Sequence, residues 1–276
     1  MFLRRGTAAA ALAACMIAGA ALAQPYPEDV PDDLARPTRV IVGNEIVFCV
    51  NRTSMLAEFE RELVAEIAGA LLLNFRIVEI DPYLPTHPYD FRSTLQDGVV
   101  YLFLAHQCDA MMGLTAASAY PDWLAPSPVY LTTNTVLATR TPIASMAELP
   151  ATARIGARIL SLSAGALTTY LRTLPGGGWT HVLYPTNESV LDRLADASVD
   201  AALVWGPAVL AYATDHPDAP PTYVLEELGF PIGPTQFVAG LRPREQFFNA
   251  SLAEAIQSLV DQGIIAELAR DHGLLR

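Results

Sequence analysis

Short apolar runs alternate with helically spaced apolar residues along most of the chain. In the first half, the runs predict strands over 45–50, 75–80 and 109–114. The segments between them predict helices that begin after residue 54 and over 91–106, with a proline-rich loop over 81–88. This β-α-β-α-β order indicates a parallel sheet with right-handed crossovers.

The second half repeats this plan. It predicts strands over 154–159, 181–184, 201–204 and 223–228, helices over 166–174, 187–195 and from Pro207, and two closing amphipathic helices over 246–261 and 264–271. Two α/β units in tandem favour two lobes with a cleft between them. The extended segments 133–140 and 236–241 are the expected hinge strands.

The turn Trp205-Gly206-Pro207 lies between a predicted buried strand and a predicted helix. Pro207 suits a first helical position, because its missing N–H would have no helical partner there. Ligands of open α/β sheets bind at such junctions, beside the carboxyl ends of strands and the amino ends of helices. Trp205 and Gly206 are therefore candidate ligand contacts, with a core tryptophan near the hinge as the alternative.

The N-terminus reads as a secretion signal. Arg4 and Arg5 precede an apolar run, and Ala21-Leu22-Ala23 forms a small-residue cleavage site, which predicts a signal peptide over 1–23 and export to the periplasm. A retained anchor and a lipoprotein attached at Cys15 are the weaker alternatives. Residues 24–39 are rich in proline and acid and are expected to form an exposed lead-in.

The chain is acidic and contains no lysine. Its formal net charge of −12 becomes −14 when cleavage removes Arg4 and Arg5. Such a chain is a poor partner for nucleic acid or an anionic membrane. The absence of lysine excludes a Schiff-base lysine and a phosphate-loop lysine.

The motifs of enzymes and metal sites are missing from the sequence. No histidine has zinc spacing with another histidine or cysteine, and there is no nucleophile elbow or dinucleotide fingerprint. The adjacent acids Glu226 and Glu227 cannot both face one site on a strand. We therefore expect a protein that is not an enzyme and that needs no cofactor or metal. We also expect a monomer.

Cys49 and Cys108 remain after cleavage, and an oxidising compartment favours a disulfide between them. If their strands are parallel neighbours, the two residues are offset by about five positions, or roughly 16 Å. A disulfide needs Cα atoms within about 7 Å. The sequence leaves the bond open.

Three stretches occur in a familiar order: the strand and helix over 45–73, the segment Cys108–Leu114 followed by Pro128-Val129-Tyr130, and the segment 146–170. Together they resemble the family-three solute-binding proteins, which bind amino acids in many bacteria. The resemblance implies a type II, two-lobed periplasmic-binding-protein-like α/β fold. Lobe 1 would comprise 40–136 plus 237–276, and lobe 2 would comprise 137–236. Each lobe would be a small, mostly parallel sheet flanked by helices.

Three further features are Cys49 at the end of the first strand, the pair Cys108-Asp109, and Val-Trp-Gly-Pro over 204–207. They resemble the MxaJ/XoxJ-like branch that accompanies quinoprotein alcohol dehydrogenases. The chain departs from amino-acid binders at two positions. Tyr120 falls where they place the arginine for the α-carboxylate, and Trp205 falls where an aspartate commonly holds the α-amino group. The resemblance therefore implies a cargo other than a free amino acid.

The candidate ligand contacts lie near the carboxyl ends of predicted strands or on the expected cleft wall. They are Asn51, Arg52, Tyr89, Arg92, Thr115, Tyr130, Ser163, Gly165, Trp205 and Gly206. Asn51 and Arg52 have a solvated turn as the alternative, and Arg92 a surface ion pair. Thr115 and the segment 163–165 have a plain helix cap as the alternative.

These observations support three hypotheses. The leading one, implied by the resemblance, is a periplasmic binding protein that assists a PQQ-dependent, methanol-type alcohol dehydrogenase. The second is the solute-binding component of an ABC transporter, which would carry a small polar solute to a permease. The third is a secreted hydrolase, for which the sequence offers no nucleophile and base.

Overall fold

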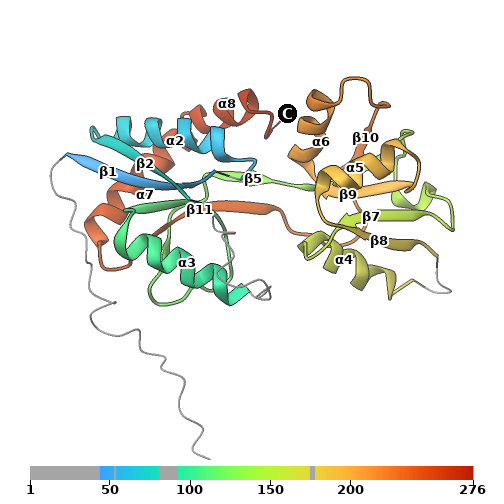
Figure 1. Ribbon diagram of the computed structural model, residues 1–276, viewed down its shortest axis with the longest axis horizontal. Coiled ribbons are helices and arrows are strands. Elements are labelled where there is room, and N and C mark those ends of the chain that lie inside the picture. The colour runs from blue at the N-terminus through green and yellow to red at the C-terminus, as the bar shows by residue number, and fades with distance from the viewer. Residues whose placement is uncertain (1–43, 53, 81–92, 175–177, 276) are drawn as a thin grey trace, which may run out of the picture. The chain divides into compact units, whose positions relative to one another are not determined.

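Two β-sheets organise the chain (Figure 1), as seen in a computed structural model that describes residues 44–52, 54–80, 93–174 and 178–275. The first sheet has the order β2-β1-β3-β11-β4, and β5 also pairs with β11. Its strands are β1 (Glu45–Asn51), β2 (Asn74–Ile80), β3 (Ala110–Thr115), β4 (Ala125–Pro126), β5 (Leu131–Thr133) and β11 (Thr235–Leu241). Strand β1 is parallel to β2 and β3, whereas β11 runs antiparallel to β3.

The second sheet has the order β10-β6-β9-β7-β8. Its strands are β6 (Thr135–Thr139), β7 (Arg154–Arg158), β8 (Thr180–Tyr184), β9 (Ala201–Trp205) and β10 (Tyr223–Leu225). Strand β7 is parallel to β8 and β9, and β6 runs antiparallel to β9. The chain enters this sheet at Asn134, between β5 and β6, and leaves it after β10.

Helices cover both sheets. With the first sheet lie α2 (Ala57–Ala70), α3 (Ser93–His106), α7 (Gln246–Asp261) and α8 (Ile264–Asp271), and with the second lie α4 (Leu162–Leu171), α5 (Asn187–Ala195) and α6 (Gly206–Asp215). A short 3₁₀ turn spans Met146–Glu148. The apolar face of α2 explains its position, because Phe59, Leu63 and Ile67 are almost fully buried in the core that α2 shares with α7 and α8.

This architecture confirms the expected α/β fold with two mostly parallel sheets, each completed by antiparallel strands. Helix α4 corrects one boundary: it begins at Leu162 and ends at Leu171, whereas the pattern predicted 166–174. The predicted strand over 223–228 ends at Leu225. The expected hinge segment 236–241 lies in β11, which pairs with β3, β4 and β5.

Some expectations concern residues that the structure does not describe. The signal peptide over 1–23, Cys15, the lead-in over 24–39 and the loop over 81–88 fall outside the described ranges. Within the described part of the chain, no helix combines the length and apolarity that a membrane span requires.

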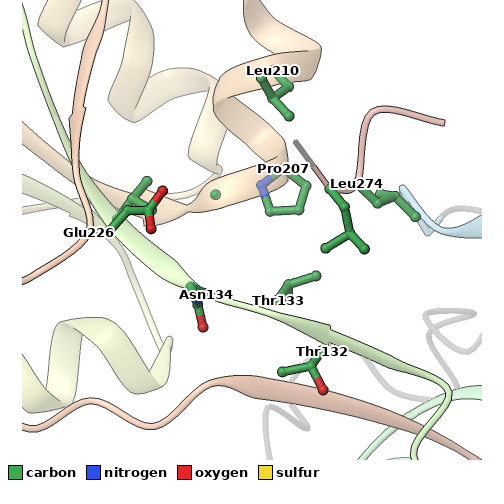
Figure 2. A pocket seen from close by; sticks show the side chains of 10 residues that line it. Thr132, Thr133, Asn134, Pro207, Leu210, Glu226 and Leu274 are labelled. Carbon is green, nitrogen blue, oxygen red and sulfur yellow. The ribbon is translucent and has the colours of Figure 1, made fainter. Parts of the chain in front are cut away.

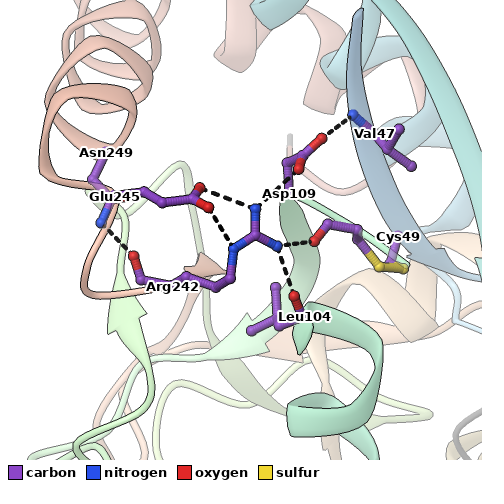
Figure 3. A network of polar contacts seen from close by, with 8 residues as sticks. Val47, Cys49, Leu104, Asp109, Arg242, Glu245 and Asn249 are labelled. Atoms are coloured by element: carbon purple, nitrogen blue, oxygen red, sulfur yellow. Dashed lines mark hydrogen bonds and ion pairs between the residues drawn. A yellow bond between two sulfur atoms is a disulfide. The ribbon is translucent and has the colours of Figure 1, made fainter. Parts of the chain in front are cut away.

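A buried arginine connects five segments of the first sheet and of the helices that cover it (Figure 3). The Arg242 guanidinium donates to the Asp109 carboxylate at 3.0 Å, to both oxygens of Glu245 at 2.7 and 3.0 Å, and to the carbonyls of Leu104 and Cys108. Asp109 also accepts the N–H of Val47 at 2.8 Å. These bonds connect β1, α3, the start of β3, the end of β11 and the start of α7.

The Arg242 network is both buried and charged. The Arg242 side chain is 9% exposed and that of Asp109 is 0% exposed. Burial by itself would lower the pKa of Arg242, but the hydrogen bonds with Glu245 and Asp109 outweigh it and raise that pKa, so the guanidinium stays charged. Removing one partner would leave a buried charge without compensation.

We predict that Arg242→Met lowers the free energy of unfolding by about 3–5 kcal/mol, because Asp109 then loses its buried counter-charge. Denaturant unfolding measures this change. The matched control is Arg193→Met, which removes the half-exposed ion pair with Asp196 and is expected to have a much smaller effect, because solvent screens that pair. Equal losses in the two variants would contradict a central role for the network.

Cys49 and Cys108 form a disulfide with a Cα–Cα distance of 5.6 Å, and both residues are fully buried. The sequence-based estimate of roughly 16 Å is wrong for two reasons. The register pairs Cys49 with Met111, so the offset is three residues. Cys108 also donates its N–H to Phe103 at the end of α3, so the chain at Cys108 turns back instead of extending the strand.

We predict that the double variant Cys49→Ala/Cys108→Ala loses about 2–4 kcal/mol of unfolding free energy, because the bond closes a loop with a sequence separation of 59. Denaturant unfolding of the oxidised protein and of the double variant tests this. A reductant should destabilise the natural sequence and leave the double variant unchanged. If it shifts both proteins equally, the disulfide is not the source of the difference.

Candidate functional site

The carboxyl ends of β1 and β3 carry three of the predicted site residues on neighbouring parallel strands. Asn51 ends β1 and is half-buried, and its carbonyl accepts the N–H of Ser54. Arg52 follows with an exposed side chain, and its N–H donates to Ile80. Thr115 ends β3 and is exposed. This edge of the first sheet therefore presents an amide, a guanidinium and a hydroxyl.

The carboxyl end of β7 leads directly into α4, and the predicted contacts there lie inside the helix. Ser161 is the N-cap, and its Oγ accepts the N–H of Ala164 at 3.1 Å. The N–H of Gly165 donates to the carbonyl of Ser161 at 3.2 Å. Ser163 is 7% exposed, with its Oγ 2.8 Å from that of Ser161. The predicted helix start at residue 166 is therefore wrong for this segment: Ser161 supplies the cap, and Ser163 and Gly165 lie in the first turn of α4.

Apolar side chains surround this cap. Ile159, Leu160 and Leu162 are 47%, 81% and 84% exposed. Leu160 also has a φ of +58°, in the left-handed region that disfavours a branched side chain. The edge of the second sheet beside α4 therefore combines exposed leucines with the hydroxyl of Ser161.

Trp205 and Gly206 come together with the strand that connects the sheets. The indole N–H of Trp205 donates to Thr133 Oγ1 at 2.6 Å, and its ring lies edge-on to Phe237 with centroids 6.2 Å apart. The N–H of Gly206 donates to the carbonyl of Asn134 at 2.8 Å. Both donors are thus used within the protein. This agrees with the alternative interpretation of Trp205 as a core residue near the hinge.

A pocket of about 140 Å³ lies beside this junction (Figure 2). Its lining is mostly apolar or hydroxylic: Thr132, Thr133, Asn134, Val136, Gly206, Pro207, Leu210, Glu226, Leu274 and Leu275. Glu226 is the charged member of this lining. The pocket has room for a small group and no concentration of charge.

The prediction that Tyr130 lies on the cleft wall is wrong. It is 4% exposed, and its hydroxyl donates to Glu60 Oε1 at 2.8 Å while it accepts the N–H of Gly113 at 2.8 Å. A side chain so enclosed belongs to the core. Tyr120, which falls where amino-acid binders place an arginine, accepts the N–H of Ala117 with its hydroxyl at 2.9 Å.

Sequence reasoning missed Glu60, which is fully buried in the first turn of α2. Burial raises the pKa of its carboxyl to about 7, although the hydrogen bond from Tyr130 lowers it. The available signal was spacing: an acid at position 60 shares a helix face with the apolar residues at positions 63, 64 and 67. An acid on an apolar face is a candidate for a buried, perturbed group.

The remaining predicted contacts, Tyr89 and Arg92, lie outside the described residues. Over the ranges that the structure describes, no group of three or more histidine, cysteine or acidic side chains could hold a metal ion.

No protein-family model and no curated protein sequence matches this chain. Solved structures do match its fold. An ancestral cationic amino acid solute-binding protein superposes with a TM-score of 0.62 at 14% identity, covering 83% of this chain and 95% of its own. A Streptococcus pneumoniae domain, described as the second substrate-binding domain of an amino acid ABC transporter, gives 0.61 at 16% identity, with 83% and 99% covered. A Bacillus subtilis protein gives 0.61 at 16% identity, with 83% and 89% covered. The chain therefore has the two-lobed fold of periplasmic binding proteins.

We predict that Gly206→Ala lowers the unfolding free energy by about 1–3 kcal/mol, because the new Cβ would lie 3.0 Å from the carbonyl oxygen of Asn134. The matched control is Gly165→Ala in α4, where a Cβ meets nothing within 4 Å. That variant should gain about 0.5–1 kcal/mol from helix propensity. Thermal or denaturant unfolding measures both. A stabilised Gly206→Ala protein would disprove the close contact.

Proposed function

We propose that this protein is a solute-binding protein that captures a small polar solute in the periplasm and delivers it to an ABC permease. The observation that carries the proposal is the fold: two α/β sheets that the chain crosses twice, shared over 83% of its length with binding proteins of solved structure. Two lobes that close around a ligand are the mechanism that this fold offers. Lobe 1 would comprise 40–136 plus 237–276, and lobe 2 would comprise 137–236.

The ligand edge that we propose is formed by the carboxyl ends of β1, β3 and β7. Asn51, Arg52 and Thr115 would bind the polar part of the solute, since they lie at the ends of adjacent strands. Leu160 and Leu162, with their high exposure beside α4, would contact its apolar part. Tyr89 and Arg92 remain predictions for the wall of the first lobe.

The proposed solute is not a standard amino acid. An α-amino acid needs an anionic group for its ammonium and a fork of donors for its carboxylate. The positions where amino-acid binders commonly carry these groups are occupied here by Trp205 and Tyr120. Their polar atoms are already bonded to Thr133 and to the backbone of Ala117.

A ligand panel tests the proposal. Sugars, polyols, organic acids and amino acids are screened by thermal unfolding, and hits are measured by calorimetric titration. A solute present at 100 times its Kd adds about 2.7 kcal/mol and should raise Tm by several degrees. The proposal expects a hit outside the amino acids. A panel without hits would contradict solute binding, and tight binding of an amino acid would contradict the proposed class.

Variants at the proposed edge make the test specific. Thr115→Ala and Arg52→Gln should each weaken the Kd of the hit by about tenfold, the typical effect of one lost hydrogen bond to a polar or charged group. Neither variant should change the Tm of the ligand-free protein by more than a degree or two. Arg172→Gln, at the opposite end of α4, is the matched control and should leave the Kd unchanged.

The role beside a quinoprotein dehydrogenase stays a second prediction. The residues that suggested this role make structural contacts within the protein. Cys49 and Cys108 form the disulfide, Asp109 pairs with Arg242, and Trp205 donates to Thr133. These contacts account for the residues without a dehydrogenase. Co-purification with such an enzyme, and loss of its activity on deletion of this protein, would favour this role over the transporter.

A further inference from the structure

A buried carboxyl group in the first lobe lacks a full set of partners. Glu60 is 0% exposed, and its Oε1 accepts the hydrogen bond from Tyr130. Its second oxygen, Oε2, has no hydrogen-bond partner among the described residues. A buried polar atom without a partner is costly, and far more so when it carries charge.

Glu60 is connected to the ligand end of β3 through two short contacts. Tyr130 accepts the N–H of Gly113 with the same hydroxyl that donates to Glu60. Gly113 has a φ of +79°, and a Cβ there would lie only 3.0 Å from Oε1 and 3.3 Å from Oε2. The register of β3 with β11 is irregular at this point, between Val238 and Gly240. Thr115 of the proposed ligand edge follows two residues later.

The same tyrosine fixes the start of the connection between the sheets. The N–H of Tyr130 donates to the carbonyl of Phe237, and Leu131 begins β5 in register with Phe237. Three residues beyond Leu131, Asn134 leads into β6. Tyr130 is therefore bonded to β3 through its hydroxyl and to β11 through its backbone N–H, directly before the strand that crosses between the sheets.

The charged groups of the elements packed around Glu60 are directed elsewhere. The ion pairs are Arg61 with Glu58 and Glu79, Glu62 with His272, Glu45 with Arg76, and Arg242 with Asp109 and Glu245. The other charged residues of these elements are exposed: Glu66, Glu254, Asp261, Glu267, Arg270 and Asp271. Tyr130 is the titratable group that contacts Glu60, and burial raises the pKa of Tyr130 well above its usual value. Among the described residues, no cation pairs with Glu60. An ionised Glu60 would therefore be a buried charge stabilised by one hydrogen bond.

We propose that Glu60 is a protonation-controlled positioning residue. As a neutral acid it holds Tyr130, the backbone of Gly113 and thereby the ligand end of β3. As a carboxylate it draws in water or backbone donors and displaces that end. The effect on solute affinity rests on the proposed function, whereas the effect on Gly113 does not.

The sign of the pH dependence follows from the raised pKa of about 7 against an ordinary value of 4.5. A raised pKa in the folded state means that the neutral group stabilises the fold. This contribution is complete below pH 4.5 and is lost as the pH rises through 7. Solute affinity depends on ionisation in the folded protein alone, so it should fall as the pH rises through and above about 7.

The test compares the natural sequence with Glu60→Gln from pH 5 to 9. Glutamine stays neutral, and its amide oxygen can still accept the Tyr130 hydrogen bond. We expect the amide resonance of Gly113 to titrate with a midpoint near pH 7 in the natural sequence and to stay constant in Glu60→Gln. The Kd for the solute found in the panel should weaken by tenfold or more in the natural protein and remain flat in the variant. Glu66→Gln, an exposed acid on the same helix, is the control and should behave as the natural sequence.

Two readouts separate this inference from the proposed function. The first is the pH titration of the Gly113 amide and of the Glu60 carboxyl carbon by NMR in the ligand-free protein. It requires neither a solute nor a variant that folds. If Glu60 and Gly113 titrate together near pH 7, positioning is supported even where the panel yields no ligand. The inference is overturned if Glu60 titrates near its ordinary pKa, or if the Gly113 amide resonance does not change when Glu60 ionises. A solute whose affinity is independent of pH would overturn the affinity step.

Discussion

The first sheet depends on one charge that is buried together with its counter-charges. Five hydrogen bonds around Arg242 connect segments from the beginning, middle and end of the described chain. Few side chains can do this: a planar group with five donors satisfies two carboxylates and two carbonyls at once. The disulfide beside it fixes the same turn after α3. Glu60, on helix α2 that packs against β1 of the same sheet, shows the opposite case, because burial raises the pKa of its carboxyl to about 7 and so favours the neutral acid.

The pattern of apolar residues predicted nearly every element of the fold, because strand and helix periods depend on local burial. Helices α5, α7 and α8 begin and end where the pattern placed them. Helix α4 begins four residues early, since Ser161 and Ser163 resemble a polar loop yet act as a cap and as a buried first turn. The position of β11 inside the first sheet could not be read locally, because pairing between residues 110–115 and 235–241 depends on the whole chain.

The candidate site was less accessible from sequence. Positions at strand ends were predictable, and Asn51, Arg52 and Thr115 do lie at the ends of neighbouring strands. What each polar group already binds was not predictable. Tyr130, Trp205 and Gly206 have suitable chemistry for a ligand, but their donors serve Glu60, Thr133 and Asn134. A motif shared with a family can therefore mark a packing requirement as readily as a functional contact.

Trp205 gives this protein a built-in optical reporter. The chain has three tryptophans, and Trp123 and Trp179 lie against Tyr101 of α3 and Tyr170 of α4. Trp205 instead ends a strand of the second sheet while its indole contacts Thr133 and Phe237 of the first. Emission from an indole depends on its hydrogen bond and on nearby rings. Rotation of one sheet against the other would thus change the fluorescence of this residue, without any added label.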